Sequence, residues 1–115
     1  MTAHGSLKGR GGKLDGLFHS EEEDIGAQIK VLGSLSQSID DFFATDLELH
    51  YENVDDLNGS YTIDSASSYA GPNDVHIAAK NNGGKTVSIL GPIGAHTPSK
   101  KAVTGTLRLD TVVEY

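Results

Sequence analysis

Histidine side chains are the residues of this sequence that could bind a metal ion or move a proton near neutral pH. No two histidines have the i, i+4 spacing that places a metal-binding pair on one face of a helix. His50 and His76 fall on the polar sides of two predicted strands, so they could meet only if those strands were neighbours. We therefore expect solvated histidines, no metal centre and no cofactor. The histidines are His4, His19, His50, His76 and His96.

Two glycine-containing segments resemble parts of ligand-binding loops. Gly83-Gly84-Lys85-Thr86 resembles the end of a phosphate-binding loop, but Ala79 stands where that motif needs glycine, and the segment opens a predicted strand instead of a helix. Asp56-Leu57-Asn58-Gly59 resembles part of a calcium loop, but the first and last ligand positions would be Val54 and Ser65. Both segments are therefore predicted to be turns.

Nucleophilic and acid–base catalysis are not indicated by the sequence. There is no cysteine, and no serine lies in a Gly-x-Ser-x-Gly turn. The carboxylate pairs Asp40-Asp41 and Asp55-Asp56 are adjacent in sequence, so their side chains point apart, whereas an acid–base pair must converge on one cleft. We expect a protein that is not an enzyme.

The charge is distributed unevenly along the chain. Residues 1–18 carry a net +2, residues 19–56 carry −10 and residues 57–115 carry +1, for a total of −7. An acidic protein repels nucleic-acid phosphates, so nucleic acid is an improbable partner. A basic segment followed by an acidic block suits contact between subunits instead.

The elements that would position these residues begin with a glycine-rich basic arm over 1–18, followed by one α+β domain over 19–115. Ser20 and Glu23 have the spacing of a helix capping box. Apolar residues then recur every three or four positions, which predicts a helix over 21–44, with a break near Gly33 as the alternative. The alternation of apolar and polar residues over 27–31 also fits a strand, so that alternative stays open.

From residue 46 the apolar period changes to two, which predicts about five strands. Asn58-Gly59 is a strong hairpin signal, and residues 81–84 form a second turn. The predicted fold is α+β, with the helix packed on an antiparallel sheet of hairpin-linked strands. The last strand, over 102–113, could lie at a sheet edge and pair with a neighbour.

Length and composition agree with one small domain of 115 residues and a modest core. The first residues lack the apolar stretch of a secretory signal, and no segment has the roughly 20 apolar residues of a membrane span. We therefore expect no membrane partner, and a cytoplasmic location or, for a viral protein, the virion.

These observations favour a non-enzymatic structural protein that self-associates, or decorates a larger particle such as a virion, through its arm and its sheet edge. One alternative is a small acidic inhibitor, of the immunity or DNA-mimic type, that captures a basic partner. A weaker alternative is a domain that binds a small molecule or acts as an enzyme. The residues predicted to make the interaction are Leu7, Lys8, Arg10, Lys13, Leu17, Phe18, Glu21, Glu22, Glu23 and Asp24.

Overall fold

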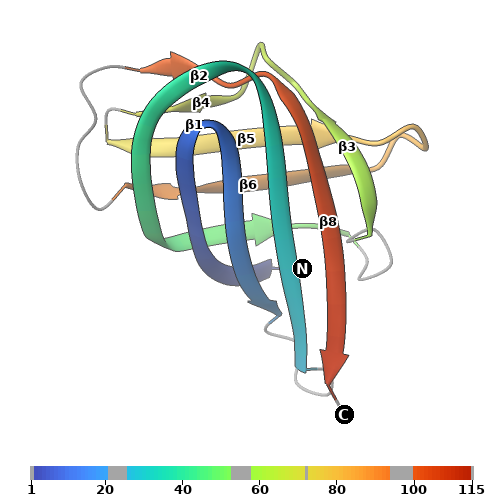
Figure 1. Cartoon of the computed structure of the whole chain (residues 1–115). Coiled ribbons are helices and arrows are strands. Elements are labelled where there is room, and N and C mark those ends of the chain that lie inside the picture. The colour runs from blue at the N-terminus through green and yellow to red at the C-terminus, as the bar shows by residue number, and fades with distance from the viewer. Residues whose placement is uncertain (1, 21–25, 53–57, 72, 94–99, 115) are drawn as a thin grey trace.

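The computed structural model of the chain is an all-β protein whose strands close into an antiparallel barrel (Figure 1). It describes residues 2–20, 26–52, 58–71, 73–93 and 100–114, without the side chains of 26, 27, 38–40 and 112–114. The predicted α+β class is wrong, because no helix occurs among the described residues. The strands are β1 (Thr2–Ser20), β2 (Gly26–His50), β3 (Gly59–Ile63), β4 (Tyr69–Ala70), β5 (Asp74–Lys80), β6 (Thr86–Pro92), β7 (Lys101–Ala102) and β8 (Gly105–Glu114).

The barrel closes because β2 is long enough to belong to two layers. Its first half pairs with β8, which pairs with β3, and β3 pairs with β5. β5 pairs with β6, and β6 returns to the second half of β2 at residues 48–50. In Figure 1, β2 arches over the molecule while β5 and β6 cross behind it. The short strands β4 and β7 extend the sheet beside β5.

The segment predicted as a helix over 21–44 forms strand β2 from Gly26 onward, while residues 21–25 lie outside the described residues. Ile29 and Val31 point into the core, and Lys30 and Leu32 point outward. This is the period of two that defines a strand, as the alternative interpretation of 27–31 proposed. Because β1 and β8 flank this half of β2, its backbone amides and carbonyls are satisfied by neighbouring strands on both edges.

Residues 2–20, most of which were set apart as an arm, form strand β1, which pairs with β2 along almost its whole length. The register shifts between Gly9 and Lys13, where Gly11 adopts a φ of 60°. This conformation costs glycine little, so the strand can fold back there. The two arms of β1 then lie inside the arch of β2 (Figure 1).

The strands predicted after residue 46 are confirmed in part. The turn at 81–84 connects β5 and β6 as a hairpin, and Asn81 Oδ1 accepts hydrogen bonds from the backbone amides of Gly83 and Lys85. The hairpin predicted at Asn58-Gly59 is wrong, because β3 pairs with β8 and β5 and not with β2. The last strand is not at an edge, because β8 lies between β2 and β3.

Inward-facing side chains from both layers fill the barrel with one continuous core. Each contributing strand alternates buried and exposed residues, as expected for a sheet with one solvated face. No part of the described chain is a helix capable of crossing a membrane. The largest fully buried side chains are Tyr61, Phe18, Leu7, Leu14, Ile29, Leu47, Leu49, Ile77, Ile89, Leu107 and Leu109.

Candidate functional site

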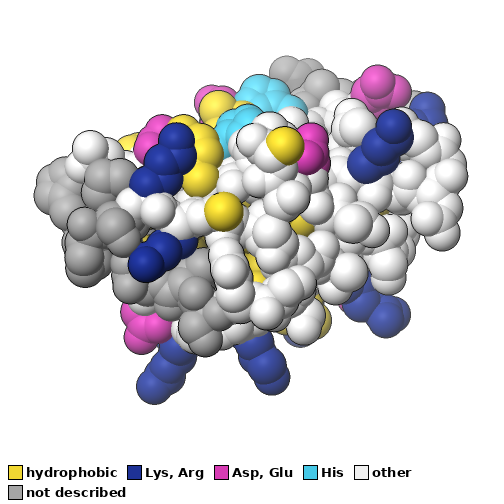
Figure 2. All heavy atoms as spheres, turned by 90° about the horizontal axis from the view of Figure 1, so that it is seen from above, with side chains coloured by type: hydrophobic (Ala, Val, Ile, Leu, Met, Phe, Trp, Pro, Cys, Tyr) yellow, Lys and Arg dark blue, Asp and Glu magenta, His cyan; other side chains and the backbone are white. Residues whose placement is uncertain are grey.

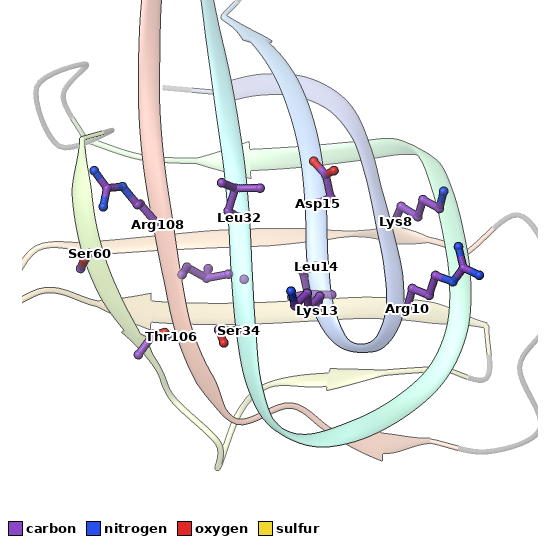
Figure 3. A pocket seen from close by; sticks show the side chains of 12 residues that line it. Lys8, Arg10, Lys13, Leu14, Asp15, Leu32, Ser34, Ser60, Thr106 and Arg108 are labelled. Atoms are coloured by element: carbon purple, nitrogen blue, oxygen red, sulfur yellow. The ribbon is translucent and has the colours of Figure 1, made fainter.

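A groove of about 640 Å³ lies on the outer side of the front layer, across β1, β2, β8 and β3 (Figure 3). The register of these strands builds its floor from two rows of outward-facing residues. One row runs Asp15, Leu32, Arg108 and Ser60, and the other runs Lys13, Ser34 and Thr106. Lys8 and Arg10, from the first arm of β1, stand at one end of the groove (Figure 3).

The groove is strongly basic in an acidic protein. It contains Lys8, Arg10, Lys13 and Arg108, which are four of the nine Lys and Arg residues of the chain, against Asp15 alone. Its formal charge is therefore +3, which leaves −10 for the rest of the protein. Concentrated charge of one sign attracts an oppositely charged partner.

Three of these cations are available to a partner. Within the described residues, no carboxylate lies within ion-pair distance of Lys8, Arg10 or Lys13, and all three are exposed. Arg108 differs, because its Nε lies 3.6 Å from Asp110 Oδ2 on the same strand. Both of those side chains are at least half exposed, so solvent screens this pair and a partner can compete for the arginine.

Exposed apolar side chains lie in the groove and on the strands beside it. Leu17, Leu32 and Phe43 are 39%, 44% and 52% exposed, and they are the large apolar residues most exposed among those described. All three lie on β1 or β2, and Leu32 stands on the floor of the groove. Phe43 lies opposite Lys8 in the register and lines a second hollow with Lys8 and Arg10. We call the groove together with Leu17 and Phe43 the basic face.

The second half of β2 carries acidic residues on its outer side. Asp46 and Glu48 point outward there, as does Glu52 two residues beyond the strand, while Leu47, Leu49 and Tyr51 are buried. Within the described residues, Asp46 has no cation at ion-pair distance, whereas Glu52 Oε2 lies 3.6 Å from Lys85 Nζ. Glu52 is 70% exposed, so that ion pair is weak. We call these three residues the acidic stripe.

Glu48 also joins two histidines. His4 Nε2 lies 3.3 Å from Glu48 Oε1, and His50 Nε2 lies 3.1 Å from Glu48 Oε2. The hydrogen bond from His4 and then that from His50 hold the pKa of Glu48 below its usual value, because they favour the ionised carboxylate. The three side chains share the outer face because His4 pairs with Glu48 across the strands and His50 follows two residues on.

A further polar cluster lies near β4. The Tyr69 ring stacks on His76 with centroids 6.0 Å apart, and Lys100 Nζ lies 4.1 Å from the centre of the Tyr69 ring. The Tyr69 hydroxyl donates to Asp74 at 3.0 Å, which raises the pKa of Tyr69 because the carboxylate opposes ionisation of the phenol. His76 Nδ1 lies 2.7 Å from the carbonyl oxygen of Ser67. These contacts hold the side chains of the cluster in place, and Tyr69 and Lys100 line a hollow there.

His50 and His76 are not on neighbouring strands, because β6 lies between β2 and β5. Within the described part of the chain, no group of three or more histidine and carboxylate side chains is placed to hold a metal ion.

The predicted interaction residues separate into three groups. Lys8, Arg10 and Lys13 converge on the groove, and Leu17 is exposed on the same face. Leu7 and Phe18 are fully buried, so they stabilise the barrel and do not offer a surface to a partner. The acidic residues 21–24 lie outside the described residues.

The sequence alone did not indicate several residues of this site. Arg108, Leu32 and Phe43 join the basic face only through strand pairing that brings residues up to 100 positions apart together. His4 meets Glu48 for the same reason. The only local signal was the alternation Glu48-x-His50, which places both side chains on one side of a strand.

Comparison with protein-family models, with curated proteins and with solved structures found no match to this chain. The fold and the groove define a small β-barrel protein with a basic, partly apolar outer face.

Proposed function

We propose that this protein is a non-enzymatic assembly protein whose copies associate through the basic face. The observation that carries the proposal is the coincidence, on one face, of three cations without carboxylate partners among the described residues and three exposed apolar side chains. Interfaces combine apolar and aromatic contacts with arginine in this way. Apolar residues gathered on one exposed face of a small protein indicate a contact surface.

The partner must be acidic, and the chain itself supplies acidic surface. Outside the groove the chain carries −10, so a second copy is electrostatically attracted to the basic face. This attraction is sensitive to ionic strength because the cations are exposed. The apolar contacts supply a contribution that salt does not screen.

A second candidate function is the binding of an organic anion. The volume of the groove lies in the usual range of small-molecule sites, and Ser34, Ser60 and Thr106 offer hydroxyl groups beside the cations. The remaining alternative, an acidic surface over residues 21–24 that captures a basic partner, falls outside the described residues and stays a prediction.

The test is the solution mass of the protein, measured by light scattering on a sizing column at about 0.05 M and about 1 M salt. We expect a discrete assembly at low salt and a smaller mass at high salt. The variant Lys8→Glu/Arg10→Glu should give the 12.1 kDa monomer at both salts. The control Lys80→Glu/Lys101→Glu makes the same change in charge on exposed residues outside the groove, and it should assemble like the wild type.

A wild-type protein that is monomeric at both salts contradicts the assembly proposal. In that case the groove would be tested for the second function by titration with inorganic phosphate and with a phosphorylated sugar. Binding that is lost in Lys8→Glu/Arg10→Glu but kept in the control would support the anion site.

A further inference from the structure

We propose that the copies associate head to tail, with the acidic stripe of one copy docked on the basic face of the next. This inference rests on the proposed function and adds the second half of the interface to it. The two surfaces carry opposite charge, and each contains side chains that lack a strong ion pair among the described residues.

The two surfaces follow one another along β2. The basic face lies on the first half of β2 with β1 and β8, and it reaches the second half at Phe43, which pairs with Lys8. The acidic stripe begins at Asp46, where β2 continues and pairs with β6 in the layer that crosses behind (Figure 1). Figure 2 shows some Lys and Arg side chains projecting along one long edge of the molecule, while most of the visible Asp and Glu side chains, together with other Lys and Arg side chains, lie toward the other edge.

The outward side chains of β2 change in charge along the strand. On its first half, the outward residues Lys30, Leu32 and Ser34 are basic, apolar or neutral, and the basic residues of β1 and β8 flank them. On its second half, Asp41 and Phe43 lie beside Lys8 and Arg10, and the acidic stripe follows, with Glu52 two residues beyond the end of the strand. Among the described residues, no carboxylate of the stripe lies at ion-pair distance from Lys8, Arg10 or Lys13, so one copy does not neutralise its basic face with its own acidic stripe.

In the acidic stripe, the carboxylates of Asp46 and Glu52 are more available to a partner cation than that of Glu48. Glu48 accepts hydrogen bonds from two histidines, whereas Asp46 is exposed without a cation at ion-pair distance among the described residues. A partner cation, above all the guanidinium of Arg10, can form a charge-assisted pair with such a carboxylate. Apolar contact by Leu32 and Phe43 would add to that pair.

Head-to-tail contact has a specific consequence for the assembly. A two-fold dimer uses the same patch on both partners and stops at two copies. An interface that joins two different patches leaves one of each patch unused in every dimer, so the assembly grows into a ring or a filament. The proposal therefore predicts assemblies larger than a dimer.

The experiment mixes two variants, each of which lacks one half of the interface. Lys8→Glu/Arg10→Glu removes the basic face, and Asp46→Asn/Glu52→Gln removes the acidic stripe. Each variant alone should be monomeric at low salt. In the mixture, the intact basic face of the second variant meets the intact stripe of the first, so a 1:1 particle of twice the 12.1 kDa chain mass should form and grow no further.

Each outcome separates the two proposals. If the wild type assembles and the stripe variant on its own assembles equally well, the head-to-tail inference is overturned. Assembly through the basic face then still stands. The same holds if the wild type assembles but two folded monomeric variants form no 1:1 particle. A monomeric wild type overturns both proposals. Circular dichroism establishes that each variant folds, and Lys8→Gln/Arg10→Gln replaces the first variant if it does not.

Discussion

The fold-back of β1 makes a direct prediction about Gly5. A Cβ atom added there would lie 2.6 Å from the Cα of Phe18 and closer still to the carbonyl oxygen of Leu17, both on the opposite arm of β1. Carbon atoms in ordinary contact lie about 3.5–4.0 Å apart, so Gly5→Ala must push the two arms apart by about 1 Å. These are backbone atoms, which cannot rotate away, and Phe18 is fully buried, so the core must shift with them. Overpacking of this kind costs about 3 kcal/mol of unfolding free energy.

Urea unfolding followed by circular dichroism measures this loss, and a cost of about 3 kcal/mol corresponds to a melting temperature lowered by about 12 °C for a chain of this length. The control is Gly12→Ala in the same strand, where the nearest atom outside the chain neighbours is the Leu35 carbonyl oxygen at 3.7 Å. That variant should match the wild type or be slightly more stable. If Gly5→Ala unfolds within about 0.5 kcal/mol of the wild type, the close approach of the two arms is refuted.

Three further predictions follow from single hydrogen-bonded groups. Ser68→Ala should lower the unfolding free energy by about 1–3 kcal/mol, because the buried hydroxyl donates to the carbonyl and accepts from the amide of Ala78; an unchanged urea midpoint would contradict this. Asn58→Ala should speed amide exchange at Thr111, whose amide and hydroxyl both donate to Asn58 Oδ1; equal exchange in both proteins would count against it. Glu48→Gln should be less stable than the wild type at neutral pH, and the difference should disappear as pH falls through the lowered pKa of Glu48, because a carboxylate with a depressed pKa stabilises the fold only while ionised. Urea midpoints measured from neutral to acidic pH test this, and a difference that persists in acid would refute it.

The sequence predicted the strands better than it predicted their partners. The period of two after residue 46 and the turn at 81–84 were enough to identify β5, β6 and the hairpin between them. The helix over 21–44 was wrong because Ile29 and Leu32 recur at helical spacing although they point to opposite sides of β2. At Gly33 the missing side chain leaves room for Leu14 and Leu107 to pack against β2, a contact that no local pattern reveals.

Only the part of the candidate site whose residues are close together in the sequence was predictable. Lys8, Arg10 and Lys13 stand within six residues of one another, and their shared charge was visible in the sequence. Arg108 joins them through two successive strand pairings, so its role depends on the complete sheet order. Leu7 and Phe18 were expected at a surface because a glycine-rich basic segment resembles a flexible arm, whereas the barrel needs their apolar area in its core.

Deletion of the arm predicted from the sequence is therefore not a clean test of its role in assembly. Removing residues 1–16 would take Leu7 and Leu14 out of the core and leave one edge of β2 without hydrogen-bond partners. Loss of assembly in such a protein would follow from unfolding as easily as from loss of contact. Charge changes on the outer side of β1 avoid this difficulty because they leave the inward residues in place.

The position of β8 between β2 and β3 bears on how the barrel folds. Because β2 and β3 both precede β8 in the chain, no strand bridges them until β8 inserts. Until then the edges of β2 and β3 and the apolar faces of the unfinished sheet are exposed, and such species are prone to aggregate. Insertion of β8 is therefore the step that closes the barrel, and the yield of folded protein depends on how well the unfinished sheet is protected until it occurs.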